Sequence, residues 1–318
     1  MEKRMYFIYN PHAGMERIRS NLLDIIDVFS RDGYEVTVCP TRRRGDGTEA
    51  TATMKEGYDI LVCCGGDGTL DEVVAGMMKR SDRIPIGYVP AGSTNDFART
   101  LQIPSNMQKA AEVISGGREF KCDTGSFNDR PFVYVAAFGL FTDVSYGTGQ
   151  DLKNTFGHLA YIMEAFARLG EIKSCRMKVV HDGITEEDEY LFGMVSNSLS
   201  VAGISFLAKS GIILDDGLFE VTLVKMPSGP INPGNIATAL MNGVSNEQVS
   251  FFRAKEVSFL SKEAVSWTLD GEFGGSLKRV RIENKHKSLS IMVPANANIP
   301  GKTKVPKVSI KTLPPSPA

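Results

Sequence analysis

The sequence is short of cysteine, of net charge and of long apolar runs. Only five of its 318 residues are cysteines and no CxxC pair occurs, which argues against a disulfide scaffold and against a zinc site. Lysine plus arginine (36) nearly balances aspartate plus glutamate (37), so no overall positive field favours nucleic acid. The apolar stretch at the N-terminus is too short for a signal peptide. We therefore expect a cytoplasmic protein without a nucleic-acid partner.

One uncharged segment approaches the length that would span a membrane. Residues 190–208 carry no charged side chain, but they include four serines, one asparagine and two glycines. That polarity suits a buried strand followed by a pocket loop. We expect no transmembrane segment.

Two common phosphotransferase signatures are also missing. The pattern GxxxxGK[ST] does not occur, which excludes a P-loop nucleotide hydrolase. Neither HRD nor DFG occurs, which argues against a protein kinase.

In the first 124 residues, short apolar runs typical of strands alternate with stretches of helical periodicity. Short apolar runs at residues 5–10, 34–39, 58–64 and 84–90 read as strands, and most are followed by stretches with apolar residues at helical spacing. Strand, loop and helix repeated in this way predict a parallel sheet with helices on both faces. We expect residues 1–124 to form a doubly wound α/β nucleotide-binding domain.

The pattern changes after residue 124. Strand-like runs separated by turn residues predict an antiparallel, β-sandwich-like second domain over residues 125–294. Two helical stretches, 152–169 and 234–242, interrupt it. We leave open whether residues 295–312 return to complete the first domain.

Three polar loops follow strands of the predicted parallel sheet. They are NPHAG (residues 10–14), GGDGT (65–69) and AGSTND (91–96), and they should meet at the carboxyl edge of the sheet. Glycines at a strand-to-helix turn let backbone N–H groups approach a phosphate, and the helix N-terminus favours an anion. Asp67 would repel that phosphate unless Mg²⁺ lies between them. The alternative is a plain glycine-rich turn with an aspartate cap.

Five stretches then occur in an order that resembles the diacylglycerol kinase catalytic superfamily. They are NPHAG, GGDGTLDEV, PAGSTNDFAR, LDDGLFEV and LDGE. The chain is most similar to the soluble bacterial lipid kinases, relatives of the sphingosine kinases, from Asn10 to about Val293. GGDGT alone also occurs in NAD kinases and phosphofructokinases, so the later motifs carry the specificity.

The resemblance implies a fold of the NAD kinase/diacylglycerol kinase type and transfer of the γ-phosphate of Mg·ATP to a lipid hydroxyl. The implied nucleotide-binding residues are Asn10, Pro11, Ala13, Gly14, Thr41, Gly65, Gly66, Asp67, Gly68, Thr69, Glu72, Gly92, Ser93 and Asn95. Glu272 would be the general base, with Asp270 beside it and Asp67 as a further catalytic carboxylate. A structural Mg²⁺ site would use Asp215 or Asp216 with the carbonyl of Leu218. Asp71 stands where asparagine is usual in the family.

Several alternatives stay open at this stage. Diacylglycerol, giving phosphatidic acid, is the favoured substrate, met transiently at the membrane surface. The other interpretations are an NAD kinase-like enzyme and a nucleotide-binding regulator without catalysis. A homodimer is left open. The bulky apolar residues that could line an acyl-chain groove are Phe138, Phe141, Tyr161, Met163, Phe166, Phe192 and Phe206.

Overall fold

The computed structural model describes residues 3–14, 17–139, 174–198, 212–227, 229 and 233–299. The α/β half contains β1 (Lys3–Tyr9), α1 (Arg17–Arg31), β2 (Tyr34–Pro40), α2 (Asp46–Thr53), β3 (Ile60–Gly65), α3 (Asp67–Met78), β4 (Ile86–Pro90), α4 (Asp96–Thr100) and α5 (Met107–Gly116). The β-rich half contains β5 (Arg118–Phe127), β6 (Arg130–Phe132), β7 (Val135–Gly139), β8 (Cys175–His181), β9 (Ile184–Ser196), β10 (Phe219–Lys225), α8 (Pro233–Asn242), β11 (Val249–Ala254), β12 (Glu256–Leu269) and β13 (Glu272–Val293).

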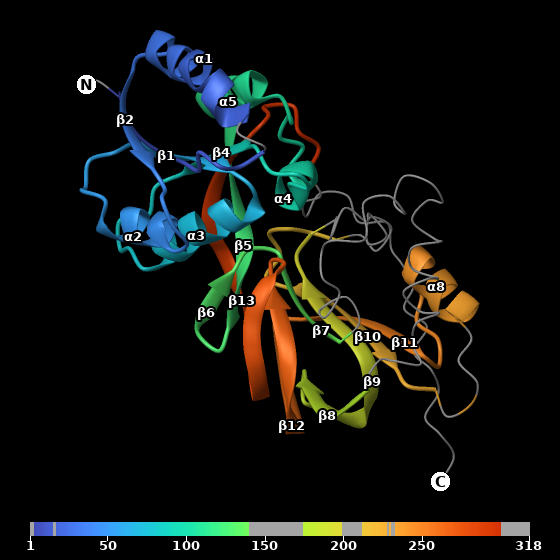
Figure 1. Cartoon of the computed structure of the whole chain (residues 1–318). Coiled ribbons are helices and arrows are strands. Elements are labelled where there is room, and N and C mark those ends of the chain that lie inside the picture. Colours follow the sequence, from blue (N-terminus) through green and yellow to red (C-terminus); the bar gives the residue numbers. More distant parts are fainter. Residues whose placement is uncertain are drawn as a thin grey trace.

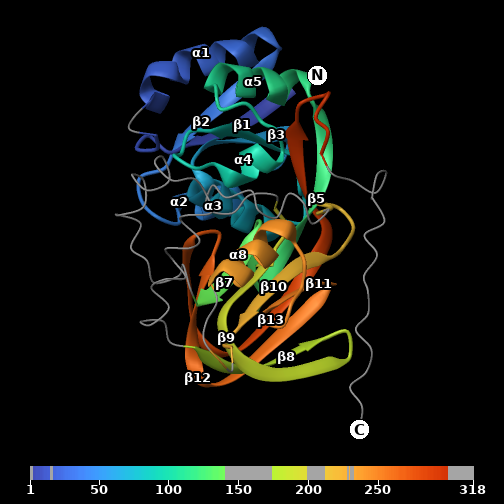
Figure 2. The ribbon, with the colours of Figure 1, turned by 90° about the vertical axis from the view of Figure 1, so that its right-hand side faces the viewer.

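The first half is the predicted parallel sheet. Its strands lie in the order β2-β1-β3-β4 and all pair in parallel. Helices α1 and α5 pack together on one face, and α2 and α3 pack together on the other (Figures 1 and 2). The doubly wound arrangement follows from the sequence pattern, because each helix has an apolar side to bury against a sheet that is apolar on both faces.

Helix α3 shows how that periodicity acts. Leu70, Val73, Val74 and Met77 recur at helical spacing and are all buried, which holds the helix on the sheet directly after the GGDGT loop. Burial of one such side chain contributes about 1.5–3 kcal/mol. The helix that carries the candidate phosphate loop is therefore fixed by its own hydrophobic face.

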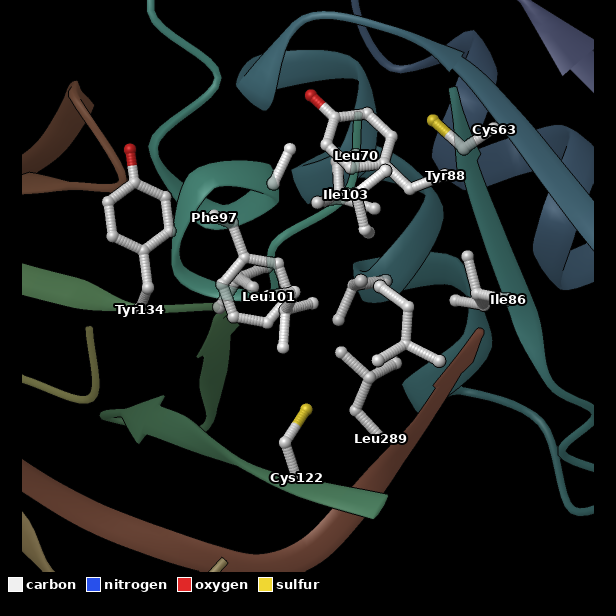
Figure 3. Packing of buried hydrophobic residues seen from close by; sticks show 14 of the residues in the cluster. Cys63, Leu70, Ile86, Tyr88, Phe97, Leu101, Ile103, Cys122, Tyr134 and Leu289 are labelled. Carbon is white, nitrogen blue, oxygen red and sulfur yellow. The ribbon is translucent and has the colours of Figure 1, made fainter. Parts of the chain in front are cut away.

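The two halves share part of their core. Figure 3 shows Leu70, Ile86 and Phe97 of the α/β half near Cys122 of β5 and Leu289 of β13, all within one buried cluster. The ring of Tyr134 stacks on that of Phe97, with centroids 6.2 Å apart. These contacts join the halves through apolar packing around the candidate site.

Strands β5 and β13 run through both halves. They pair antiparallel from Ile282↔Phe127 to Val293↔Arg118, and Ile291 of β13 also pairs in parallel with Ile86 of β4. The predicted boundary between residues 124 and 125 therefore falls inside β5. The end of β13 completes the parallel sheet, and residues 300–312 of the segment proposed for that role lie outside the described residues.

The second half differs from the expected sandwich in its connectivity. Strand β12 pairs with both β7 and β8, and β9 pairs with the same two strands, so the hydrogen bonding closes on itself. Among the described residues, one sheet of 13 strands thus continues from the first half and curls around a second core. Trp267 lies in that core. The ring centroids of Phe127, Phe138 and Phe259 each lie within 5.2 Å of its ring centroid.

The structure tests only those remaining predictions that concern described residues. The helix predicted at 234–242 is confirmed as α8. Phe138 and Phe192 are buried core residues, which argues against a place in an open acyl groove. The helix predicted at 152–169, Phe141, Tyr161, Met163, Phe166 and Phe206 lie outside the described residues. Among the helices that the structure describes, none has both the length and the apolar character needed to cross a membrane.

Candidate active site

The three polar loops meet in one cleft, as predicted. The order β2-β1-β3-β4 changes direction between β1 and β3, and in such sheets ligands bind outside the carboxyl ends of these strands. The cleft there encloses about 720 Å³. Asn10 Nδ2 after β1 donates to Thr69 Oγ1 in the first turn of α3 (3.4 Å). A Cβ on Gly92 would lie 2.7 Å from the Cα of Gly66, so the second and third loops touch through glycine.

The GGDGT segment forms the turn into α3. Gly66 is the N-cap residue, its backbone is extended, and no side chain caps the helix. Asp67 is therefore the first helical residue and does not act as the predicted alternative cap. A 12-residue helix whose N-terminus borders the cleft presents N–H groups and a positive dipole end to an anion.

Asp67 has one carboxylate oxygen without a partner. Its Oδ2 accepts the N–H of Asp96 (3.2 Å), while Oδ1 is buried and accepts no hydrogen bond. Burial raises the pKa of Asp67 to about 6, and the charges of Asp96 and Asp270 act in the same direction. A buried, unsatisfied carboxylate oxygen can take a divalent cation, but no three acidic, histidine or cysteine side chains of the described residues gather at Asp67, so such an ion would depend on water and ligand oxygens.

Asp270 is fully engaged by the backbone. It is buried, Oδ2 accepts the N–H of Val133 (2.6 Å), and Oδ1 accepts those of Tyr134 (2.9 Å) and Val135 (2.9 Å). Three such bonds hold the turn that precedes Glu272, and the left-handed φ of Asp270 (49°) is kept by them. The structure gives Asp270 a positioning role at the site.

Asp71 faces Asp270 from α3. Burial, followed by the charge of Asp270 and a hydrogen bond to it, raises the pKa of Asp71 well above its usual range. Arg130 opposes this shift, and Glu272 adds to it. In its protonated form Asp71 would donate to the Asp270 carboxylate as an asparagine amide would.

Glu272 reaches the phosphate loop from the opposite half. It is the first residue of β13, its side chain is half-exposed in the cleft, and a Cβ on Gly68 would lie 3.7 Å from its Oε1. Its Oε2 lies 3.0 Å from Arg44 Nη2. The predicted base and the predicted phosphate loop are thus brought together.

The other predicted nucleotide residues fall into two groups. The cleft is lined by Asn10, Ala13, Gly14, Thr41, Gly66, Gly68, Thr69, Glu72, Gly92 and Ser93, whereas Pro11, Gly65, Asp67 and Asn95 are outside this lining set. Glu72 has backbone partners, because its carboxylate accepts the N–H groups of Gly45 (2.7 Å) and Gly47 (3.0 Å) at the start of α2. Asn95 shapes the third loop through Oδ1, which accepts the N–H of Gly92 (2.9 Å).

Four residues here were not among the predicted catalytic, nucleotide-binding or metal-binding residues. Asp96 lies in the quoted motif NDFAR, but only the structure shows its backbone against Asp67. Arg44 and Arg130 line the cleft from opposite halves. Asp123 is buried in β5 and accepts the N–H groups of Gly217 (2.7 Å) and Lys287 (2.7 Å). These pairs are far apart in the chain, and no spacing rule finds them.

The two aspartates of the LDDGLF turn differ in their partners. Asp216 forms an ion pair with Arg253, and its Oδ1 accepts the N–H of Leu218 (3.0 Å). Asp215 Oδ2 lies 3.3 Å from Lys287 Nζ, while its buried Oδ1 accepts no hydrogen bond. Of the two, Asp215 fits a metal better. In the described part of the chain no three acidic, histidine or cysteine side chains gather around a metal position, so an ion here would depend on backbone oxygens and water.

Known proteins are similar in sequence to most of this chain. The sequence profile of the diacylglycerol kinase catalytic domain matches residues 4–127. The diacylglycerol kinase of Staphylococcus aureus (strain bovine RF122 / ET3-1) is 36% identical over 280 residues, which cover 87% of this chain and 88% of the relative.

Solved structures give the same result at the level of the fold. A crystal structure of a candidate diacylglycerol kinase from Bacillus anthracis strain Sterne has a TM-score of 0.76 at 25% identity and covers 92% of this chain and 95% of its own. A second structure from that strain has a TM-score of 0.78 at 24% identity. With 36% identity across most of both sequences, the protein belongs to the diacylglycerol kinase catalytic-domain family of lipid kinases.

Proposed function

We propose that the protein transfers the γ-phosphate of ATP to the hydroxyl of diacylglycerol, giving phosphatidic acid. The observation that carries the proposal is the approach of Glu272 to Gly68 at the N-terminus of α3, inside one cleft. A carboxylate beside a helix N-terminus combines a proton acceptor with a phosphate site, and phosphoryl transfer needs both.

The nucleotide would lie across the three loops. Backbone N–H groups at Gly66 and Gly68 face the phosphates, Thr69 and Ser93 add hydroxyl groups, and Thr41 borders the adenosine end. Asp67, through its free Oδ1, would hold a Mg²⁺ ion directly or through water. When bound, that ion neutralises charge on the phosphate oxygens.

Glu272 would accept the proton of the lipid hydroxyl. The hydroxyl oxygen bonds to the γ-phosphorus, the bond from that phosphorus to the β–γ bridging oxygen breaks, and ADP departs with the electron pair. Asp270 contributes by fixing the turn through its three backbone hydrogen bonds. A second Mg²⁺ at Asp215 and the Leu218 carbonyl would stabilise the turn without entering the reaction.

The rim beside Glu272 suits a lipid surface. Phe273 is 64% exposed, and its carbonyl accepts a hydrogen bond from Arg130 (3.4 Å). An aromatic ring next to a guanidinium matches the boundary between acyl chains and anionic headgroups. We propose peripheral, transient membrane association at this rim, with residues 1–124 serving mainly ATP and residues 125–294 mainly the lipid.

The test is ADP release from Mg·ATP with a panel of micellar lipids, with NAD as a parallel acceptor. Release with diacylglycerol, together with phosphatidic acid in the products, is the expected result. Release with NAD alone, or nucleotide binding without any turnover, would overturn the proposal.

A further inference from the structure

The loop between β2 and α2 carries three consecutive arginines on a firmly held backbone. The N–H groups of the first two donate to Asp46 Oδ2 (2.8 and 3.1 Å). The N–H of Gly45 donates to Glu72 Oε1 (2.7 Å), and Gly45 has a φ of +90°, which favours glycine. The backbone is therefore fixed on both sides of Arg44.

The side chains of the arginines take different directions. Arg43 Nε pairs with Asp46 Oδ1 (3.1 Å), within its own loop and helix. Arg44 lines the cleft and pairs with Glu272 Oε2 (3.0 Å), while the Oε1 atom of Glu272 approaches Gly68. Arg44 thus joins the two halves next to the phosphate loop, at the group that we assign as the base.

This ion pair is suited to exchange. The side chains of Arg44 and Glu272 are 72% and 47% exposed, and pairs exposed to that degree contribute little free energy. A terminal phosphate carries more charge than one carboxylate and accepts two parallel hydrogen bonds from a guanidinium. A nucleotide at the N-terminus of α3 would therefore compete well for Arg44.

We propose that Arg44 leaves Glu272 for the γ-phosphate when ATP binds, so that both carboxylate oxygens of the base are unpaired only in the loaded cleft. The inference rests on the proposed kinase function. Until Arg44 leaves, one Glu272 oxygen is occupied by the guanidinium and does not accept the hydroxyl proton. After the exchange, Arg44 stabilises charge on the equatorial γ-phosphate oxygens, and the transferred proton goes to Glu272.

Nucleotide affinity tests the exchange without requiring turnover. Calorimetry at fixed Mg²⁺ and ionic strength would compare a non-hydrolysable ATP analogue with ADP. Arg44→Ala should weaken the analogue about tenfold more than ADP, because only the analogue has a γ-phosphate. Arg43→Ala, the matched control, should keep the wild-type ratio of the two affinities.

A double-mutant cycle sharpens the test. Glu272→Gln removes the competitor for Arg44, so it should tighten the ATP analogue about two- to fivefold. The same change in an Arg44→Ala background should give no tightening. Equal losses for analogue and ADP in Arg44→Ala, or tightening that persists without Arg44, would overturn the exchange.

The proposal and the kinase function fail in different ways. If the affinity pattern holds while the wild type makes no phosphatidic acid, the substrate assignment is wrong and the exchange stands. If the wild type makes phosphatidic acid while Arg44→Ala treats both nucleotides alike, the exchange is wrong and the kinase function stands.

Discussion

The cleft and the LDDGLF turn both gather acidic side chains, but different groups neutralise them. At the turn, Asp216 and Glu220 share Arg253, and Asp215 faces Lys287. Beside the cleft, the charge of Asp270 acts on both Asp67 and Asp71, and neither forms an ion pair among the described residues, although Arg130 lowers the pKa of Asp71. The turn thus contains its own cations, whereas a proton or an external cation would compensate Asp67 and Asp71.

That difference separates stability from function. Charges compensated inside the protein stabilise the fold, and removal of one partner is costly. Charges left uncompensated reduce the free energy of unfolding, and in the proposed function a bound Mg·nucleotide would compensate them. Substitutions at the LDDGLF turn should therefore change mainly the free energy of unfolding, and substitutions at the cleft should change mainly activity.

The largest expected effect lies in the cleft. Glu272→Gln should lower kcat about 10²- to 10⁴-fold, because the lipid hydroxyl loses its proton acceptor. Initial rates with diacylglycerol in mixed micelles measure this, and calorimetry checks that nucleotide still binds. Glu263→Gln, an exposed glutamate before the same turn, is the control. Wild-type turnover in Glu272→Gln would remove Glu272 from the mechanism.

The next effect belongs to the turn. Arg253→Met leaves Asp216 and the buried Glu220 without their shared cation and should lower the free energy of unfolding by about 3–5 kcal/mol. Urea unfolding near pH 7 measures it. Burial raises the pKa of Glu220 to about 8 and Arg253 opposes this shift, so the loss in Arg253→Met should grow between pH 7 and pH 9, and adding Glu220→Gln should remove that growth. A loss below about 1 kcal/mol would show that the turn does not depend on this pair.

Replacement of Asp67 should raise the free energy of unfolding but abolish kinase activity. Its pKa rises from 3.8 to about 6 on folding, so its stabilising contribution is complete below pH 3.8 and is lost as the pH rises through 6. Asp67→Asn should therefore be about 1–2 kcal/mol more stable than wild type at pH 8 without Mg²⁺, and inactive as a kinase. Asp32→Asn, an exposed position, is the control. Equal stability at pH 4 and pH 8 relative to wild type would contradict the burial argument.

Asp71→Asn should have little effect on kcat. If Asp71 is protonated and donates to Asp270, the amide replaces that donor, and kcat near pH 7 should change less than about threefold. Asp71→Leu, which removes the donor, should lower kcat more than Asp71→Asn does. Rates measured from pH 6 to pH 9 would test this. Equal losses of kcat in both variants would show that activity does not depend on a hydrogen bond from residue 71 to Asp270.

The smallest effect concerns metal at the turn. Mg²⁺ without nucleotide should raise Tm by about 1–3 °C if an ion completes Asp215 Oδ1, and Asp215→Asn should abolish the rise. Asp67→Asn should keep it. A rise of the same size in Asp215→Asn would place the ion elsewhere.

The sequence predicted what repeats locally. The periodicity of residues 18–29 and 70–78, and the loops after three strands, fixed the α/β half and the place of the cleft. It did not predict that Asp270 binds three N–H groups of residues 133–135, or that Glu72 holds the start of α2. Those partners are 25 or more positions apart in the chain, so local patterns carry no sign of them. The closure of the curled sheet was not predicted for the same reason, because it depends on the pairing of β12 with two strands that are distant in the chain.

The shared strand β13 makes the two halves one mechanical unit. Its pairing with β5 is interrupted between Lys285 and Leu289, where Lys287 has a φ of 50°, so the strand bends where it passes between the halves. His286 and Lys287, in this bend, contact Asp123 and Asp215. Neither half can be cut out as an independent fragment without taking a strand from the other. The LDDGLF turn is therefore tied, through Asp215, to the segment of β13 at which the two halves join.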